Sequence, residues 1–171
     1  MARDLPIVKP VIPEGLKGEK NGQLSKTKLV TIEPFGKLYP SAAEAWRLMR
    51  EAARLDEIRL RPTSSFDTYR PLSVQQAVFR QRYTQEVLEG RPTRTCEGVL
   101  YWLRPGMAAA ACAGTSNHGW GLAVDIWNVG KNGRLEWLLD NALRFGFSWE
   151  LQSEPWHLRY VLGDKTPKVA V

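Results

Sequence analysis

The 171-residue sequence lacks long apolar runs, internal repeats and low-complexity segments, and it contains only two histidines and two cysteines. Because no run approaches the roughly 20 apolar residues that cross a bilayer, we expect no membrane insertion. The two cysteines are too few for a disulfide framework. Cys96 and Cys112 either bond to each other or remain as small buried thiols, which is the commoner state in a reducing compartment.

The N-terminus also lacks the apolar segment of a signal peptide, so we expect the protein to be made in the cytoplasm and to stay there at first. Its net charge is +6, and a basic surface attracts polyanions such as nucleic acids, anionic membranes and bacterial wall polymers. The lysines and arginines are scattered rather than gathered in a block, which does not favour a specific nucleic-acid partner. The length fits one domain, and a monomer is the default expectation.

The composition of the chain changes along its length. Residues 1–36 are rich in proline, lysine and glycine and are predicted to form an extended arm that lies across the domain. The domain itself is assigned to residues 37–165, followed by a tail at 166–171. Seven tryptophans either pack in the core of this domain or line an aromatic groove.

Hydrophobic periodicity predicts three helices, at about 41–55, 73–88 and 134–145. Ser41 and Glu44 have the spacing of a capping box at the start of the first, and Gly90 and Gly146 follow the ends of the other two. Strands are predicted near 28–32, 58–61, 99–103, 121–127, 147–150 and 156–161. Strands and helices do not alternate regularly, so the predicted fold is α+β with a central antiparallel sheet flanked by helices.

The two histidines lie in short segments that suit a metal site. Side chains alternate along a strand, so Asp125 points away from the core-facing aliphatic residues of its predicted strand. Glycines at 119 and 121 permit a turn that returns His118 to Asp125, and His157 joins them if its strand is a neighbour. Two imidazoles, one carboxylate and an open position form a catalytic zinc site, although other divalent ions also suit these ligands.

Glu154 precedes His157 by three residues, and Pro155 disfavours a regular strand between them. We therefore expect Glu154 to lie in a loop over the metal, where it can accept a proton from water and pass it to a leaving amine. Each residue alone is weak evidence, because single histidines are more often hydrogen-bonded structural groups. An unpaired carboxylate in an apolar strand is costly, so Asp125 does require a cation or strong donors.

These residues also carry a resemblance to a family. The pattern Ser116-x-His118-x-x-Gly121-x-Ala123-x-Asp125, followed by Glu154-x-x-His157, resembles the signature of the peptidoglycan zinc peptidases. That group comprises D-alanyl-D-alanine carboxypeptidases and L-alanyl-D-glutamate endopeptidases, together with lysostaphin and the hedgehog signalling domain. The likeness extends upstream to Tyr69, Arg70 and Gln75, covering roughly residues 38–162. It implies a hedgehog-like α+β fold, one Zn²⁺ on His118, Asp125 and His157, and Glu154 as catalytic base.

The resemblance further implies that Arg70 binds the carbonyl or carboxylate of the substrate, and a guanidinium is suited to stabilising an oxyanion. Ser116 corresponds to a family serine near the substrate backbone, although a simple turn residue explains it equally well. Asp67 stands where family members often have serine, so it is expected to replace a hydroxyl contact with substrate. Trp156 is a candidate for the wall of a groove, with core packing as the alternative.

The implied function is hydrolysis of the stem peptide of peptidoglycan. A bacteriophage endolysin needs no export signal, because it waits in the cytoplasm of the infected host before lysis. We therefore favour a bacteriophage endolysin. For lysis, an endopeptidase that cuts between L-Ala and D-Glu is favoured over a D-alanyl-D-alanine carboxypeptidase, because only the former severs cross-linked wall. The alternative of another class is a non-catalytic zinc domain that binds wall peptide or a protein, and the presence of Glu154 and Arg70 argues against it.

Overall fold

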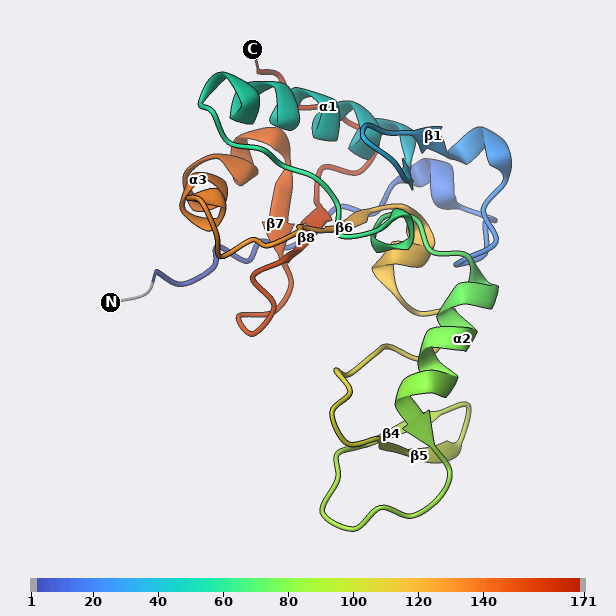
Figure 1. Ribbon diagram of the computed structural model, residues 1–171. Coiled ribbons are helices and arrows are strands. Elements are labelled where there is room, and N and C mark those ends of the chain that lie inside the picture. The colour runs from blue at the N-terminus through green and yellow to red at the C-terminus, as the bar shows by residue number, and fades with distance from the viewer. Residues whose placement is uncertain (1–2, 170–171) are drawn as a thin grey trace.

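The computed structural model describes residues 3–169, and in them helices are combined with three small antiparallel sheets (Figure 1). The helices are α1 (Pro40–Leu55), α2 (Leu72–Arg82) and α3 (Arg134–Asn141). One sheet pairs β1 (Val30–Thr31) with β2 (Lys37–Leu38). A second has the order β3 (Tyr83–Thr84), β5 (Val99–Leu103), β4 (Thr93–Cys96), and a third the order β6 (Ala123–Asp125), β8 (His157–Tyr160), β7 (Phe147–Trp149). The predicted α+β class is confirmed.

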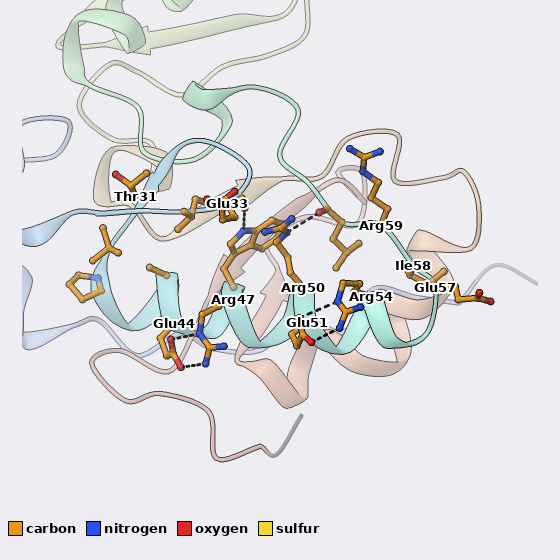
Figure 2. A pocket seen from close by; sticks show the side chains of 16 residues that line it. Thr31, Glu33, Glu44, Arg47, Arg50, Glu51, Arg54, Glu57, Ile58 and Arg59 are labelled. Carbon is orange, nitrogen blue, oxygen red and sulfur yellow. Dashed lines mark hydrogen bonds and ion pairs between the residues drawn. The ribbon is translucent and has the colours of Figure 1, made fainter.

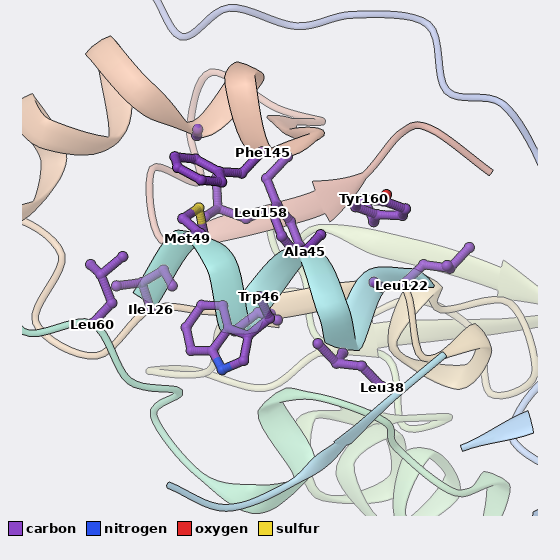
Figure 3. Packing of buried hydrophobic residues seen from close by; sticks show 14 of the residues in the cluster. Leu38, Ala45, Trp46, Met49, Leu60, Leu122, Ile126, Phe145, Leu158 and Tyr160 are labelled. Atoms are coloured by element: carbon purple, nitrogen blue, oxygen red, sulfur yellow. The ribbon is translucent and has the colours of Figure 1, made fainter. Parts of the chain in front are cut away.

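The main core lies between α1 and the β6–β8–β7 sheet. Apolar residues recur along α1 at helical spacing; Trp46 and Met49 belong to one buried cluster with Ile126 and Leu158, and Met49 lies beside Leu158 (Figure 3). All four side chains are at most 2% exposed. Burying one large apolar side chain contributes roughly 1.5–3 kcal/mol. This packing fixes β6 and β8 side by side, and the ends of these two strands carry candidate site residues.

The start of α1 differs from the prediction. The helix begins at Pro40, whose missing N–H suits the first helical position, so Ser41 lies inside the helix and cannot cap it. The Ser41 hydroxyl donates instead to the Gly163 carbonyl at 2.7 Å, and Glu44 pairs with Arg47. The predicted capping box is therefore wrong, although the predicted helix is present.

The second helix is shorter than predicted, because α2 ends at Arg82 rather than near residue 88. Tyr83 and Thr84 leave the helix and pair with Leu103 and Trp102 of β5. Sheet pairing over a long sequence distance has overridden the local helical pattern. The hairpin of β4 and β5 extends away from the rest of the molecule at the end of α2 (Figure 1).

The hairpin unit, residues 72–113, has its own small core of Phe79, Tyr83 and Leu103. A disulfide joins Cys96 at the end of β4 to Cys112 in the chain that returns to the main body. The structure thus decides between the two states expected for the cysteines, in favour of pairing.

The C-terminal half follows the prediction closely. The third helix, continued by a 3₁₀ turn at Ala142–Phe145, ends at Gly146 with a left-handed backbone. The strands β7 and β8 then follow, and both lie within their predicted segments.

The N-terminal segment packs along the domain. Leu5, Leu16, Leu24 and Ile32 are all buried in the main core cluster. The domain boundaries themselves stay a prediction, and residues 1, 2, 170 and 171 of the expected arm and tail lie outside the described residues. Within 3–169, no helix combines the length and apolarity needed to cross a membrane.

Gly121 is the backbone position on which we expect the turn into β6 to depend. Its φ is +66°, and an added Cβ would lie 2.8 Å from the backbone nitrogen of Tyr39. We predict that Gly121→Ala lowers the free energy of unfolding by roughly 1–3 kcal/mol, because left-handed strain adds to this contact. Gly130→Ala is the matched control, since an added Cβ there meets nothing within 4 Å. Urea denaturation checks both, and equal stabilities would contradict the prediction.

Candidate metal centre and active site

Three side chains that are distant in sequence converge at one end of β6 and β8. Asp125 and His157 are direct cross-strand partners, and His118 lies in the 3₁₀ turn Asn117–Trp120 that precedes β6. One oxygen or nitrogen atom from each lies within 4.8 Å of the others. The structure therefore brings together the three residues that were predicted from the sequence to be zinc ligands.

Local backbone geometry explains how His118 reaches this place. The Ser116 hydroxyl accepts a hydrogen bond from the His118 amide at 3.2 Å and so caps the turn. Gly121 closes the same turn in the left-handed region, after which β6 begins. Ser116 is predicted from the sequence to contact substrate. In the structure it caps this turn, and it also lines the cavity described below.

The atoms that face Asp125 are set by contacts on the far side of each imidazole ring. His118 places Nε2 at 3.3 Å from Asp125 Oδ2, and its Nδ1 contacts the Thr68 carbonyl at 2.9 Å. His157 places Nδ1 at 2.8 Å from Asp125 Oδ1, and its Nε2 contacts Glu150 Oε2 at 2.6 Å. One nitrogen of each ring is therefore directed at the aspartate between them.

These contacts shift the pKa values of Asp125, His157 and Glu150. Burial opposes ionisation of Asp125, but hydrogen bonds and attraction to His118 and His157 outweigh it and hold its pKa well below the ordinary value. Burial also opposes protonation of His157, yet hydrogen bonds to Asp125 and Glu150 raise its pKa to about 9. Burial opposes ionisation of Glu150, but hydrogen bonds to His157 and Asn117 and attraction to His157 and Arg159 together outweigh it and lower its pKa. In the metal-free protein, protonated His157 therefore lies between the ionised carboxylates of Asp125 and Glu150.

The donor set fits a zinc ion. Zinc prefers tetrahedral coordination by nitrogen and oxygen at roughly 2.0–2.2 Å, which separates neighbouring ligand atoms by roughly 3.3 Å. The contacts from Asp125 to the two histidines, at 3.3 and 2.8 Å, are close to that spacing. His118, Asp125 and His157 are largely buried, with side chains 5%, 16% and 12% exposed. A cation held there would satisfy the buried carboxylate of Asp125.

A cavity of about 720 Å³ opens onto this cluster. All of the predicted site residues line it, namely Asp67, Arg70, Ser116, His118, Asp125, Glu154, Trp156 and His157. Glu154 lies in a turn immediately before β8, with its carbonyl accepting from the His157 amide, as expected of a loop residue beside the metal site. Trp156 is 41% exposed at the cavity, whereas Trp149 is buried in the core.

Arg70 and Asp67 form one unit at the wall of this cavity. Arg70 donates from Nη2 to Asp67 Oδ1 at 3.0 Å and from Nε to the Phe66 carbonyl at 2.9 Å. The Asp67 carboxylate also accepts from the Ser64 hydroxyl at 2.7 Å. These contacts make Asp67 the residue that orients the guanidinium, a role that sequence reasoning did not anticipate.

Three further residues of the cavity were missed from the sequence. Arg82 and Arg94 come from the hairpin unit, and only the fold brings them to the cavity that contains the metal cluster. Glu150 belongs to no motif; the one sequence signal is its place directly after β7, which aligns it with His157 across the β7–β8 pair.

A second groove, of about 680 Å³, runs along α1 and contains none of the predicted site residues. Its charged side chains largely satisfy one another, because Arg47 pairs with Glu44 and Arg54 with Glu51 (Figure 2). Exposed pairs of this kind contribute little and leave no convergent reactive groups. The chemistry of the molecule therefore belongs to the cavity at the metal cluster.

The raised pKa of His157 predicts that the free energy of unfolding of the metal-free protein depends on pH. Protonated His157 stabilises the fold fully below its unfolded pKa of 6.5, and this stabilisation is lost as the pH rises through about 9. In the presence of a chelator, we expect the free energy of unfolding to fall between these pH values, and to fall less in His157→Gln. Urea denaturation across this range checks the slope. Parallel profiles for the two proteins would contradict the prediction.

Residues 36–163 match the family model described as VanY: D-alanyl-D-alanine carboxypeptidase. No curated protein sequence is detectably similar to the chain.

Solved structures agree with the family model. The chain is 25% identical to a variant of the vancomycin resistance D,D-pentapeptidase VanY from a VanB-type resistance cassette in complex with Zn(II), covering 78% of each chain with a TM-score of 0.52. It is 26% identical to VanYB in complex with D-alanine-D-alanine, covering 78% of this chain and 76% of that one, with a TM-score of 0.54. It is also 26% identical to the LdcB LD-carboxypeptidase, covering 84% and 72%, with a TM-score of 0.59. The predicted enzyme class, a peptidoglycan metallopeptidase, is confirmed, and the chain belongs to the VanY D-alanyl-D-alanine carboxypeptidase family.

Proposed function

We propose that this protein is a zinc-dependent peptidase that hydrolyses a peptide bond in the stem peptide of peptidoglycan, with His118, Asp125 and His157 as the zinc ligands. The observation that carries the proposal is the convergence of these three side chains at the cavity that also contains Glu154 and Arg70. Family membership and the Zn(II) complex of a relative support it.

Zinc bound at this site supplies a Lewis acid that polarises the scissile carbonyl and acidifies water. Glu154 acts as general base at the edge of the cavity, taking the proton of the attacking water and delivering it to the leaving amine. Because the backbone of Glu154 is fixed in the turn before β8, its carboxylate is carried on the same strand end as His157. The base and one ligand thus keep a constant relation to each other.

Arg70 binds the oxygen of the substrate on which negative charge develops or already resides. Its side chain is 15% exposed at the cavity wall, and Asp67 and the Phe66 carbonyl hold its fork in one orientation. An oriented guanidinium stabilises either the oxyanion of a tetrahedral intermediate or a terminal carboxylate. Arg82 and Arg94 add positive charge along the same cavity, which suits the carboxylate-rich stem peptide.

Carboxypeptidase action is the form of this activity that the relatives support best. The family is described by D-alanyl-D-alanine carboxypeptidase activity, and the LdcB relative is an LD-carboxypeptidase. The endopeptidase favoured by the sequence, acting in phage lysis between L-Ala and D-Glu, is the second candidate. This second candidate is supported by the cavity, which has a volume of about 720 Å³ and extends to the hairpin unit. It has room for peptide on both sides of a scissile bond.

The disulfide bears on where the protein acts. Disulfides persist in oxidising surroundings and are rare in the reducing cytoplasm. The Cys96–Cys112 bond therefore supports action on the wall outside the membrane, after any stay in the cytoplasm.

Digestion of purified peptidoglycan by the zinc-loaded protein tests the activity and its position. Mass analysis of the released fragments is expected to show free D-alanine if the protein is a carboxypeptidase. New L-Ala carboxyl and D-Glu amino ends would identify the endopeptidase instead. Release of no fragment by zinc-loaded protein would overturn the proposed function and favour the non-catalytic binding domain.

The role of Glu154 gives a separate prediction. Glu154→Gln removes the proton acceptor and keeps the shape of the side chain, so we expect the hydrolysis rate to fall by about 10²–10⁴-fold. Bound zinc, measured by elemental analysis, is expected to stay at one equivalent. Glu136→Gln, an exposed substitution on α3, is the matched control and should retain full activity. Retained hydrolysis in Glu154→Gln would remove Glu154 from the mechanism.

A further inference from the structure

Glu150 lies against the outer nitrogen of one candidate ligand, His157, at 2.6 Å. We infer that Glu150 is a positioning residue of the zinc centre: its carboxylate holds the proton of His157 on Nε2, so that Nδ1 faces the metal. The inference rests on the proposed zinc site. It assigns a second acidic residue of the cavity, which the family motif does not contain.

The carboxylate of Glu150 is held firmly enough for this role. Its Oε1 accepts from Asn117 Nδ2 at 2.6 Å, and its Oε2 contacts His157. Arg159, whose side chain is 7% exposed, lies 3.8 Å away through Nε, and that nitrogen has no hydrogen-bond partner among the described residues. Glu150 thus has a hydrogen bond on each oxygen and a guanidinium beside it, which fixes its orientation relative to the ring of His157.

The same contacts link the two halves of the metal site. Asn117 directly precedes His118 in the 3₁₀ turn, whereas Glu150 directly follows β7, and His157 begins β8. The Asn117–Glu150–His157 chain of hydrogen bonds therefore ties the turn that carries one ligand to the strand that carries another. Loss of the central carboxylate is expected to loosen both.

The two histidines are consequently expected to coordinate through different nitrogens. A neutral imidazole carries its proton on one nitrogen, and the hydrogen bond made by that nitrogen determines which one remains for the metal. The Thr68 carbonyl can only accept, so His118 is protonated on Nδ1 and presents Nε2. The Glu150 carboxylate likewise only accepts, so His157 is protonated on Nε2 and presents Nδ1. A charged acceptor also makes the ring a stronger donor to the metal.

Glu150 is unsuited to be the base that activates water. Both of its oxygens are engaged by donors of the protein, Oε1 by the Asn117 amide and Oε2 by the ring of His157. Glu154, by contrast, accepts no hydrogen bond on its carboxylate within residues 3–169, although it lines the same cavity. The two glutamates therefore have separate tasks, orientation of a ligand and proton transfer.

Zinc affinity tests the assignment without reference to catalysis. The dissociation constant of wild type, Glu150→Gln and Glu150→Ala is measured by competition with a chromogenic chelator, with Glu89→Gln as an exposed control carboxylate. We expect Glu150→Ala to weaken zinc binding by about 10- to 100-fold, the usual effect of removing such a partner. Glu150→Gln, which keeps an acceptor oxygen, is expected to fall between Ala and wild type.

The outcomes separate this inference from the proposed function. If wild type binds zinc tightly and both Glu150 variants have the same zinc dissociation constant as wild type, the role of Glu150 is overturned and the proposed function is not. Loss of hydrolysis in Glu150→Gln at unchanged zinc affinity would also overturn it, since that result belongs to a general base. Failure of the wild-type protein to bind zinc would overturn the proposed function, and with it this role for Glu150.

The protonation pattern provides a second readout that a merely structural role would not change. Because the chain has only two histidines, nitrogen NMR of the zinc-loaded protein resolves each imidazole. We expect a proton on Nδ1 of His118 and on Nε2 of His157, and we expect Glu150→Gln to change the His157 signal more than the His118 signal. A proton on Nδ1 of His157 in the wild-type protein would overturn the assignment even if the Ala variant fails to fold.

Discussion

The pairing of β6 with β8 is the constraint on which the rest of the site depends. It places Asp125 opposite His157, and a register shift of β8 by one residue would turn His157 to the face of the sheet away from Asp125. Burial of Val124 and Leu158 in the same pair, both 0% exposed, prevents that shift. The metal cluster is therefore held in place by the apolar core beneath it, because the residues that alternate with the ligands are packed against α1.

Much of the metal cluster could be predicted from sequence because it depends on local rules. Alternation along a strand places Asp125 away from Val124, and glycine at 121 allows the left-handed turn that returns His118. The third helix, with Gly146 after its final turn, also follows from periodicity and helix-ending signals. In each case one short segment contains the information needed.

The features that could not be predicted depend on contacts between distant segments. The end of α2 is set by the pairing of Tyr83 with Leu103, which local helical preference does not reveal. The contact of Asp67 with Arg70 depends on side-chain direction in a loop, and the use of Ser41 depends on a carbonyl near the C-terminus. Glu150 was missed because its partner becomes its neighbour only through the β7–β8 register. Such contacts become visible only after the strands are paired.

The hairpin unit supplies a part of the cavity that is built separately from the ligands. Arg82, Arg94 and the short side chains of Ala108–Ala111 come from this unit, which has its own small core and its own disulfide. Substitutions there can alter which peptide fits without disturbing the strands that hold the reactive groups. The architecture thus lets selectivity diverge among descendants of one ancestral enzyme while the hydrolytic machinery is inherited intact.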